Sequence, residues 1–344
     1  MMNSKYISYN DSTKKNKNNL QDYFYENDFT DGLPVVIPHE SKVKLFLSNI
    51  SQKNDEIIGA IEPKKGMATV ENIVVNSIMA GCLPIHIPVI ISIIRAICKP
   101  EFNLHAIQCT TNPATPLCII NGPVIKKIEA NYGRNLLGPG NRANASIGRA
   151  VRLILKNIGG SIDGIDMATH GSPAKYTLFF AEDEEAVEWN CLHEDFGYNK
   201  KDSVVSVFGI ESVINSVAVW WEEQTLIKML AKTLRTTATS QFFSRGSPVL
   251  LMSPAHAKVF IKSGYTKNDF REKIWELSKV PITDFPNKKN IPQGEWTVVK
   301  DKVLICESPE DLNIVIAGGD EDNASHSVFF SGFCLSKCCS ELIR

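Results

Sequence analysis

The chain has 344 residues, of which 43% are hydrophobic and 22% are charged, and its formal net charge at neutral pH is -1. A globular protein of this length has room for one large domain or two domains with their own cores. The near-neutral charge, without a long basic run, argues against nucleic acid as a partner. The most apolar run, residues 83–98, is broken by prolines and an arginine and is too short to span a bilayer, so no membrane partner is expected.

The N-terminus and the cysteines bear on the compartment. Residues 1–20 are rich in Asn, Lys, Ser and Asp and lack the apolar segment of a signal peptide, so we expect a disordered tail there. The nine cysteines are scattered without paired spacing, which fits a reducing compartment better than a disulfide framework. Together these features predict a cytoplasmic protein.

The first part of the ordered chain carries helix signals followed by strand signals. Thr69 is the predicted N-cap of one helix and Gly81 its end, and Pro88 is placed in the first turn of the next helix. Apolar, β-favouring runs bounded by Asn, Pro and Gly indicate strands. In chain order we expect helices over 41–50, 69–80 and from 88 onward, then strands over 105–111 and 117–121.

The same alternation continues after a glycine-rich turn at residues 136–141. Asn144 is the predicted N-cap of an amphipathic helix that runs through Leu155, and Thr266 caps a helix near the end of the chain. The further strands are expected over 175–181, 203–208, 248–252, 303–306 and 313–317, and the further helices over 222–233, 255–262 and 267–279.

This order of elements predicts an α/β fold, Rossmann-like in the broad sense, with two α/β units whose sheets are mixed or mainly parallel. A break in composition at residues 236–240, which read Thr-Thr-Ala-Thr-Ser, predicts a boundary between the units. We therefore expect a tail over 1–20, a main α/β domain over 21–240, a smaller α/β unit over 241–330 and a mobile, Cys-containing tail over 331–344.

The glycine-rich loop is the strongest candidate for ligand binding. Gly138 and Gly140 permit positive φ and a close approach of the backbone to a ligand, and free N–H groups at the following helix start, with Arg142 beside them, would attract an anion. A Walker motif is excluded because no Lys-Ser or Lys-Thr follows the second glycine. Gly138-x-Gly140-x-x-Ala143 matches a loose dinucleotide fingerprint with Asp163 as the ribose ligand, but no strand is predicted before the loop.

Cys82 is the candidate nucleophile. It lies between two predicted helices, where the positive end of the second could make its thiol acidic, and His86 or His105 could act as the base. The alternative is that Cys82 is a small core residue. Glu182 is a further catalytic candidate at the end of a predicted strand, since ligands of α/β sheets gather beyond the carboxyl ends of strands, which favours Glu182 and Asn121 by position. Lys175, at the start of the same strand, is also a candidate because it could reach in from the preceding loop over 169–173.

No metal ligands are predicted. The histidines and cysteines show no His-x-x-x-His or Cys-x-x-Cys spacing, and Cys334, Cys338 and Cys339 lie in the predicted tail. A metal site built from residues distant in the sequence stays open. The acidic run over 183–188 is interpreted as a solvated helix face.

Several blocks together carry a family resemblance, namely residues 31–36, 69–82, 102–105, 121–123, 138–150, 166–169, 175–176 and 181–182. They resemble a bacterial family of UGSC-type (seleno)proteins, distant relatives of the selenoprotein B subunits of glycine, sarcosine and D-proline reductases. The selenocysteine-Gly-Ser-Cys motif itself is absent. Gly318-Gly319 and His326-Ser327 are similar to the Gly-Gly and His-Ser pattern of the family, which implies that His326 belongs to the substrate site.

These observations lead to one set of predicted site residues. The catalytic candidates are Cys82, His105, Lys175 and Glu182. The substrate-binding candidates are Gly138, Gly140, Asn141, Arg142, Asn144, Asn121 and His326.

Three functional hypotheses follow. The first is an enzyme that acts on a small anionic metabolite through the Cys82 thiol, and the resemblance implies that it makes or breaks a carbon–heteroatom bond, as a lyase or a reductase. The second is a dinucleotide-dependent oxidoreductase that uses the same loop. The third is a non-catalytic ligand-binding or partner subunit. No cofactor is assigned, and besides the small-molecule substrate, the sequence leaves open a homo-oligomer or a redox partner protein.

Overall fold

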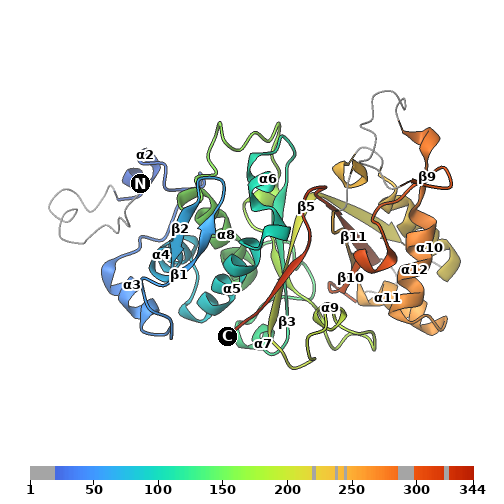
Figure 1. Ribbon diagram of the computed structural model, residues 1–344. Helices are drawn as coiled ribbons and strands as arrows, with labels where there is room; N and C mark the ends of the chain where they lie inside the picture. The colour runs from blue at the N-terminus through green and yellow to red at the C-terminus, as the bar shows by residue number, and fades with distance from the viewer. Residues whose placement is uncertain (1–19, 219–221, 237–238, 244–245, 286–297, 321–324) are drawn as a thin grey trace.

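The computed structural model describes residues 20–344 except 219–221, 237–238, 244–245, 286–297 and 321–324. Almost all of the predicted N-terminal tail therefore lies outside the described residues. The described chain combines helices with a mixed seven-stranded sheet, which confirms the predicted α/β class (Figure 1). Among these residues, no helix has both the length and the apolar character needed to cross a bilayer.

The main sheet has the strand order β10-β6-β11-β5-β3-β4, and β12 pairs with β5. The pairs β3–β4 and β6–β10 are parallel, and the other pairs are antiparallel. The strands are β3 (Thr115–Asn121), β4 (Phe179–Ala181), β5 (Val204–Ala218), β6 (Val249–Met252), β10 (Asn313–Ile316), β11 (Ser325–Gly332) and β12 (Cys339–Leu342).

The sheet consists of two units with the same topology. In the first unit, β3 and β4 are a parallel pair, and β5 returns antiparallel beside β3. In the second unit, β6 and β10 are the parallel pair, and β11 returns beside β6. Because β5 and β11 pair antiparallel, the strand order reads the same from either edge, as it would for two copies related by a two-fold rotation. One sheet therefore runs through both predicted domains.

The sheet curls until its two edge strands meet at one end. The backbone N–H of Asp183, after β4, donates to the carbonyl of Ile316 in β10 over 2.8 Å. Six of the seven strands, all but β12, place apolar side chains inside the curl, and these form a core of their own. Its members include Leu117, Ile119, Phe180, Phe208, Ile210, Val249, Leu251, Val315 and Phe330. Alternate residues of the same strands face the helices, as the period of two requires.

Two layers of helices cover the outside of the curled sheet, one for each unit (Figure 1). The first layer contains α4 (Val70–Ala80), α5 (Ile87–Ile97), α6 (Leu104–Cys109) and α8 (Arg142–Asn157), with α2 (Leu20–Glu26), α3 (Glu40–Leu47), α7 (Val124–Lys127) and the hairpin of β1 (Ile57–Ile61) and β2 (Gly66–Thr69) around it. The second contains α10 (Glu223–Leu234), α11 (Pro254–Lys262) and α12 (Lys267–Ser278), with a small sheet of β7 (Val280–Pro281), β9 (Lys302–Val303) and β8 (Val298–Val299).

Local signals placed several helix ends correctly. The Thr69 side chain accepts the N–H of Asn72, and Gly81 ends α4 with a φ of 94°. Thr266 caps α12 as predicted. The prediction of Asn144 as the cap of α8 is wrong, because the cap is Asn141, whose side chain accepts the N–H of Asn144 over 2.9 Å.

Two strand predictions in the first unit are wrong over part or all of their length. Residues 105–111 lie mostly in α6, because Asn103 caps that helix by accepting the N–H of Ala106. Only the last three residues of 175–181 form β4, since a turn of 3-10 helix over Pro173–Lys175 precedes it. In both cases a local cap outweighs the β-favouring side chains.

The end of the chain differs most from its prediction. Instead of a mobile tail, residues 339–342 form β12, which pairs with the first half of β5. Cys339 is buried against the helices of the first unit. Lys99 and Glu341 form an ion pair of 2.8 Å that ties this strand to the end of α5. The C-terminus thus belongs to the sheet of the first unit.

Candidate functional site

Cys82 is enclosed between α4 and α8. Its thiol donates to the carbonyl of Ser146 over 3.3 Å, and the residue is 1% exposed. Burial raises the pKa of Cys82 to about 12, despite the charge of Arg142 nearby. Burial and the same arginine lower the pKa of His86 to about 4. At neutral pH the thiol is therefore protonated and shielded, which is the state of a core cysteine rather than of a nucleophile.

His105 lies far from Cys82. Its ring nitrogen Nδ1 is 3.3 Å from a carboxylate oxygen of Glu62, and its side chain is exposed. Glu62 packs beside Gly159, just beyond the end of α8, whereas Cys82 contacts Ser146 near the start of that helix. The rise per residue of an α-helix places Gly159 roughly 20 Å from Ser146. The structure does not bring this thiol and this base together.

Lys175 lies apart from both Cys82 and His105. Its ammonium group bonds both carboxylate oxygens of Asp166, over 2.8 and 2.7 Å. Burial lowers the pKa of Lys175, and the Asp166 charge opposes that effect. The pair fastens the segment between α8 and β4, and it touches neither Cys82 nor Glu182. The four predicted catalytic residues therefore do not form one site.

Asn121 and Glu182 do meet, because the parallel pairing of β3 and β4 brings their carboxyl ends together. The carboxylate of Glu182 is buried and accepts three hydrogen bonds, from the Asn121 side chain (2.7 Å), the Leu192 N–H (2.8 Å) and the Ile316 N–H (3.3 Å). Burial raises the pKa of Glu182, while the charge of Lys267 and these bonds oppose the increase. Glu182 thus joins the ends of both units to α9 (Leu192–Asp195).

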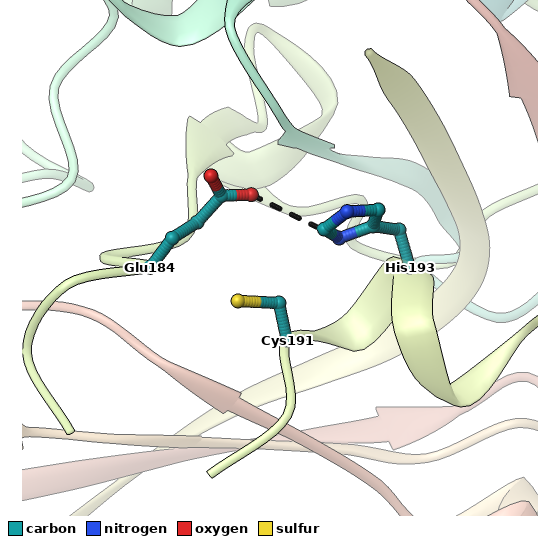
Figure 2. A group of neighbouring side chains, drawn as sticks. All are labelled: Glu184, Cys191 and His193. Carbon is teal, nitrogen blue, oxygen red and sulfur yellow. Dashed lines mark ion pairs between the residues drawn. The ribbon is translucent and has the colours of Figure 1, made fainter. Parts of the chain in front are cut away.

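Three residues beside this pair were missed from the sequence. The interpretation of residues 183–188 as a solvated helix face is wrong, since they form no helix and Glu184 turns inward. Its carboxylate accepts the Gly122 N–H over 2.7 Å. Figure 2 shows this carboxylate facing the ring of His193, with the Cys191 thiol beside them. The only local signal was a Cys-x-His pair seven residues after Glu184, which matches no standard ligand spacing.

The glycine-rich loop is held by polar contacts of its own side chains. Arg142 donates to the carbonyl of Gly81 over 3.0 Å, and the Asn144 side chain donates to the carbonyls of Asn131 and Leu136. These two predicted substrate-binding residues therefore position the loop. Asn141 does the same as the cap of α8.

The two glycines of the loop serve different purposes. Gly140 has a φ of 124°, a conformation that favours glycine. The expected positive φ is not found at Gly138, where a Cβ atom would instead lie 2.0 Å from the side chain of Asn135. Gly140 and Asn141 line one cavity of about 590 Å³ together with Lys126 and Arg134. Gly138 lines another, on the side of the sheet.

The geometry around the loop departs from a dinucleotide site. The segment before it contains α7 rather than a strand, so the strand–turn–helix context is missing. Asp163 follows the C-terminus of α8, whereas the loop precedes the N-terminus. Because α8 has 16 residues, these ends are about 24 Å apart. Asp163 is therefore out of reach of a ribose bound next to the loop.

A cavity of about 450 Å³ opens at the mouth of the curled sheet in the second unit. Its floor is apolar and continues the inner core. The floor residues are Leu136, Leu251, Ala317 and Val328. Its rim is mostly polar or glycine, with the exposed Leu137 as the apolar exception, and the polar and glycine residues are Asn135, Gly138, Asn215, Ser253, Gly318, Gly319, Ser325 and His326. The N–H of Gly318 donates to the carbonyl of Tyr132 over 2.8 Å, which closes the cavity against the segment before the loop.

Hydrogen bonds fix the polar rim. His326 Nδ1 lies 3.1 Å from the side-chain oxygen of Asn215, and with Nδ1 as the donor, Nε2 is left as an acceptor. The hydroxyls of Ser253 and Ser325 bond each other, and Ser253 is also the N-cap of α11. An apolar floor below a few oriented polar groups is the usual form of a small-molecule site.

Two residues predicted from separate parts of the sequence, Gly138 and His326, thus line one cavity. The other predicted residues hold the loop, cap a helix or lie in the buried cluster at Asn121. No protein-family model, curated protein or solved structure matches this chain. The resemblance to the UGSC-type family therefore stays a prediction.

Proposed function

We propose that the chain is an enzyme that binds a small anionic metabolite in the cavity at the mouth of the second unit. The observation that carries the proposal is the convergence of Gly138 and His326 on this cavity. The first lies in the loop predicted to bind an anion, and the second was implied by the resemblance. The volume, about 450 Å³, suits a small metabolite.

The polar groups of the rim favour an anion rather than a cation as the ligand of this cavity. None of the described lining residues is acidic, and the rim offers two hydroxyls and an imidazole. One O–H of the bonded Ser253–Ser325 pair is available to donate to a carboxylate or a phosphate, and the positive end of α11 begins at Ser253.

His326 is the proton-transfer group in this proposal. Its bond to Asn215 fixes the ring, so that Nε2 can take or give a proton when a bond from carbon to a heteroatom forms or breaks. The buried thiol of Cys82 has no part in this reaction. A reducing, cytoplasmic location is part of the proposal, and the nine cysteines, none of which forms a disulfide, support it.

Calorimetric titration with phosphate and with small mono- and dicarboxylates tests the proposal. We expect saturable binding of at least one of these anions, weakened at least about 10-fold in His326→Gln, since a bond to a charged group contributes about 1.5–3 kcal/mol. Ala317→Leu, which fills the floor of the cavity, should also weaken binding.

The matched control is His170→Gln, because His170 is an exposed histidine that does not line the cavity. It should bind as the unaltered chain does. Equal binding by the His326→Gln variant would refute the proposal. If binding were lost only in variants of Arg142, the anion site would lie at the start of α8 instead.

A further inference from the structure

Three side chains of metal-binding type converge beyond the carboxyl ends of β3 and β4 (Figure 2). We propose that Glu184, Cys191 and His193 bind one divalent transition-metal ion, with Zn²⁺ as the best match. This site is separate from the cavity of the proposed function and does not depend on it.

The geometry is that of a site before it contracts around an ion. One ligand atom from each of the three residues lies within 4.8 Å of the others. Within this group, Glu184 Oε1 and His193 Nδ1 are 3.8 Å apart. Bonds of about 2.0–2.3 Å to a tetrahedral ion place ligand atoms roughly 3.5 Å apart, so movements of about 1 Å complete the site.

Polar atoms without hydrogen-bond partners lie at the same place, which favours a ligand there. The His193 side chain is fully buried, and neither of its ring nitrogens has a hydrogen-bond partner. The side-chain oxygen of Asn121, also fully buried, lacks a partner as well. A buried polar group without a partner costs about 1–3 kcal/mol. A metal ion bound to His193 would remove part of this cost.

The charges around the cluster favour a cation. The carboxylates of Glu182 and Glu184 place negative charge in a region next to the inner core. The nearest lysine, Lys267, is already bonded to Asp195 over 2.7 Å, and Arg271 bonds the same carboxylate. Glu184 thus faces the buried imidazole of His193, and the lysine whose charge acts on Glu182 is already paired with another carboxylate.

The donor set matches zinc chemistry. A thiolate, an imidazole and a carboxylate give three protein ligands, which leaves a fourth position for water. Burial raises the pKa of the Cys191 thiol, and the charge of Glu182 raises it further, so the ion must displace a proton when it binds. The Glu184 side chain is 20% exposed and gives the ion a path into the site.

Neighbouring groups hold the ligands in place. Asn121 and the N–H of Gly122 both donate to Glu184 Oε1, which orients its carboxylate. Glu182 accepts the N–H of Leu192, the residue between the two other ligands. Such outer hydrogen bonds are typical of metal sites in proteins.

The test is titration of the purified, chelator-treated full chain with Zn²⁺ and with Co²⁺. We expect one ion per chain, and with Co²⁺ a thiolate-to-metal charge-transfer band. X-ray absorption of the zinc-loaded chain should show one sulfur at about 2.3 Å and nitrogen or oxygen at about 2.0–2.2 Å. This last readout needs no variant and so holds even if a variant fails to fold.

Cys191→Ser, His193→Gln and Glu184→Gln should each weaken Zn²⁺ binding by at least about 100-fold, since loss of a hydrogen bond to a ligand alone costs 10- to 100-fold. The matched controls are Cys306→Ser, a buried thiol elsewhere, and Glu185→Gln, an exposed neighbour bonded to Lys126. They should bind as the unaltered chain does. Absence of stoichiometric binding, zinc without a sulfur neighbour, or full binding by folded Cys191→Ser would overturn the proposal.

Discussion

The two units of the sheet share a topology but differ at the carboxyl ends of their parallel strands. Ile120 pairs with Ala181 in the first unit, as Met252 pairs with Ile316 in the second. By this register, Glu182, Asp183 and Glu184 of the first unit correspond to Ala317, Gly318 and Gly319 of the second. The first unit carries acids where the second carries the smallest residues.

The consequence is two different sites on equivalent backbones. In the first unit the acidic side chains fill the strand ends with a buried polar cluster. In the second unit the absence of side chains leaves a cavity bounded by the loop at Gly138 and by His326. The fold supplies two equivalent places, and side-chain size decides which one contains a cavity.

The largest expected effect comes from placing an acid in the second unit. Ala317→Glu would put a carboxylate into the inner core, where Ala317 is 2% exposed and no cation lines the cavity. We expect a loss of about 3–5 kcal/mol in the free energy of unfolding, the cost of an unpaired buried charge. Urea denaturation measures it, with the apolar substitution Ala317→Val as the control. A stability equal to that control would show that the two units are interchangeable here.

The converse substitution removes an acid from the first unit, at Glu182. Glu182→Gln leaves one carbonyl oxygen to face three donors, from Asn121, Leu192 and Ile316. We expect a loss of about 2–3 kcal/mol, because at least one buried donor loses its acceptor. Hydrogen exchange should also speed up in α9. Unchanged exchange there would contradict the role of Glu182 in joining α9 to the strand ends.

Glu182 also predicts a pH dependence. Burial raises its pKa in the folded state, so the folded chain binds this proton more tightly than the unfolded chain. Its contribution to stability is therefore present at low pH and is lost as pH rises from the ordinary glutamate range through the folded pKa. The difference in stability between the unaltered chain and Glu182→Gln should shrink over that window.

A smaller effect is expected from His86, which is buried in the first unit. Its pKa is lowered to about 4 from an ordinary value of 6.5, so the unfolded chain takes up a proton that the folded chain excludes. Stability should be complete above pH 6.5 and fall by roughly 2 kcal/mol as the pH drops to about 4.

His86→Asn preserves an acceptor for the N–H of Leu83, which His86 Nδ1 now accepts over 3.3 Å, and removes the titration. Its unfolding free energy should vary less between pH 6.5 and pH 4. His170→Asn, at an exposed position, should follow the unaltered chain. Parallel curves for all three proteins would show that His86 does not cause the acid sensitivity.

Sequence patterns predicted the parts of this fold that depend on neighbouring residues. Thr69, Gly81 and Thr266 act within one helical turn, and their roles were read correctly. The pairing of β12 with β5 and the meeting of Asp183 with Ile316 join residues more than a hundred positions apart, which no local signal encodes. His105 was misassigned for a different reason, because a local signal, the cap at Asn103, was not recognised.

The candidate sites show the same division between local signals, which the sequence contains, and long-range contacts, which it does not reveal. Gly138 and His326 were found because a loop motif and a resemblance marked them, but nothing in the sequence shows that they share a cavity. Cys191 and His193 were missed because their partner, Glu184, approaches them through the pairing of β3 and β4 and a turn of the chain. Their chemistry is visible in the sequence, whereas their proximity is a property of the sheet.

The most direct test of the account is an NMR titration of the histidine side chains with the anion that binds most tightly. The resonance of His326 is assigned by its absence in His326→Gln. We expect a saturable shift of His326 in the second unit, with His193 in the first unit and the exposed His170 unchanged. A shift of His193 with no change at His326 would place the ligand in the wrong unit and contradict the central claim.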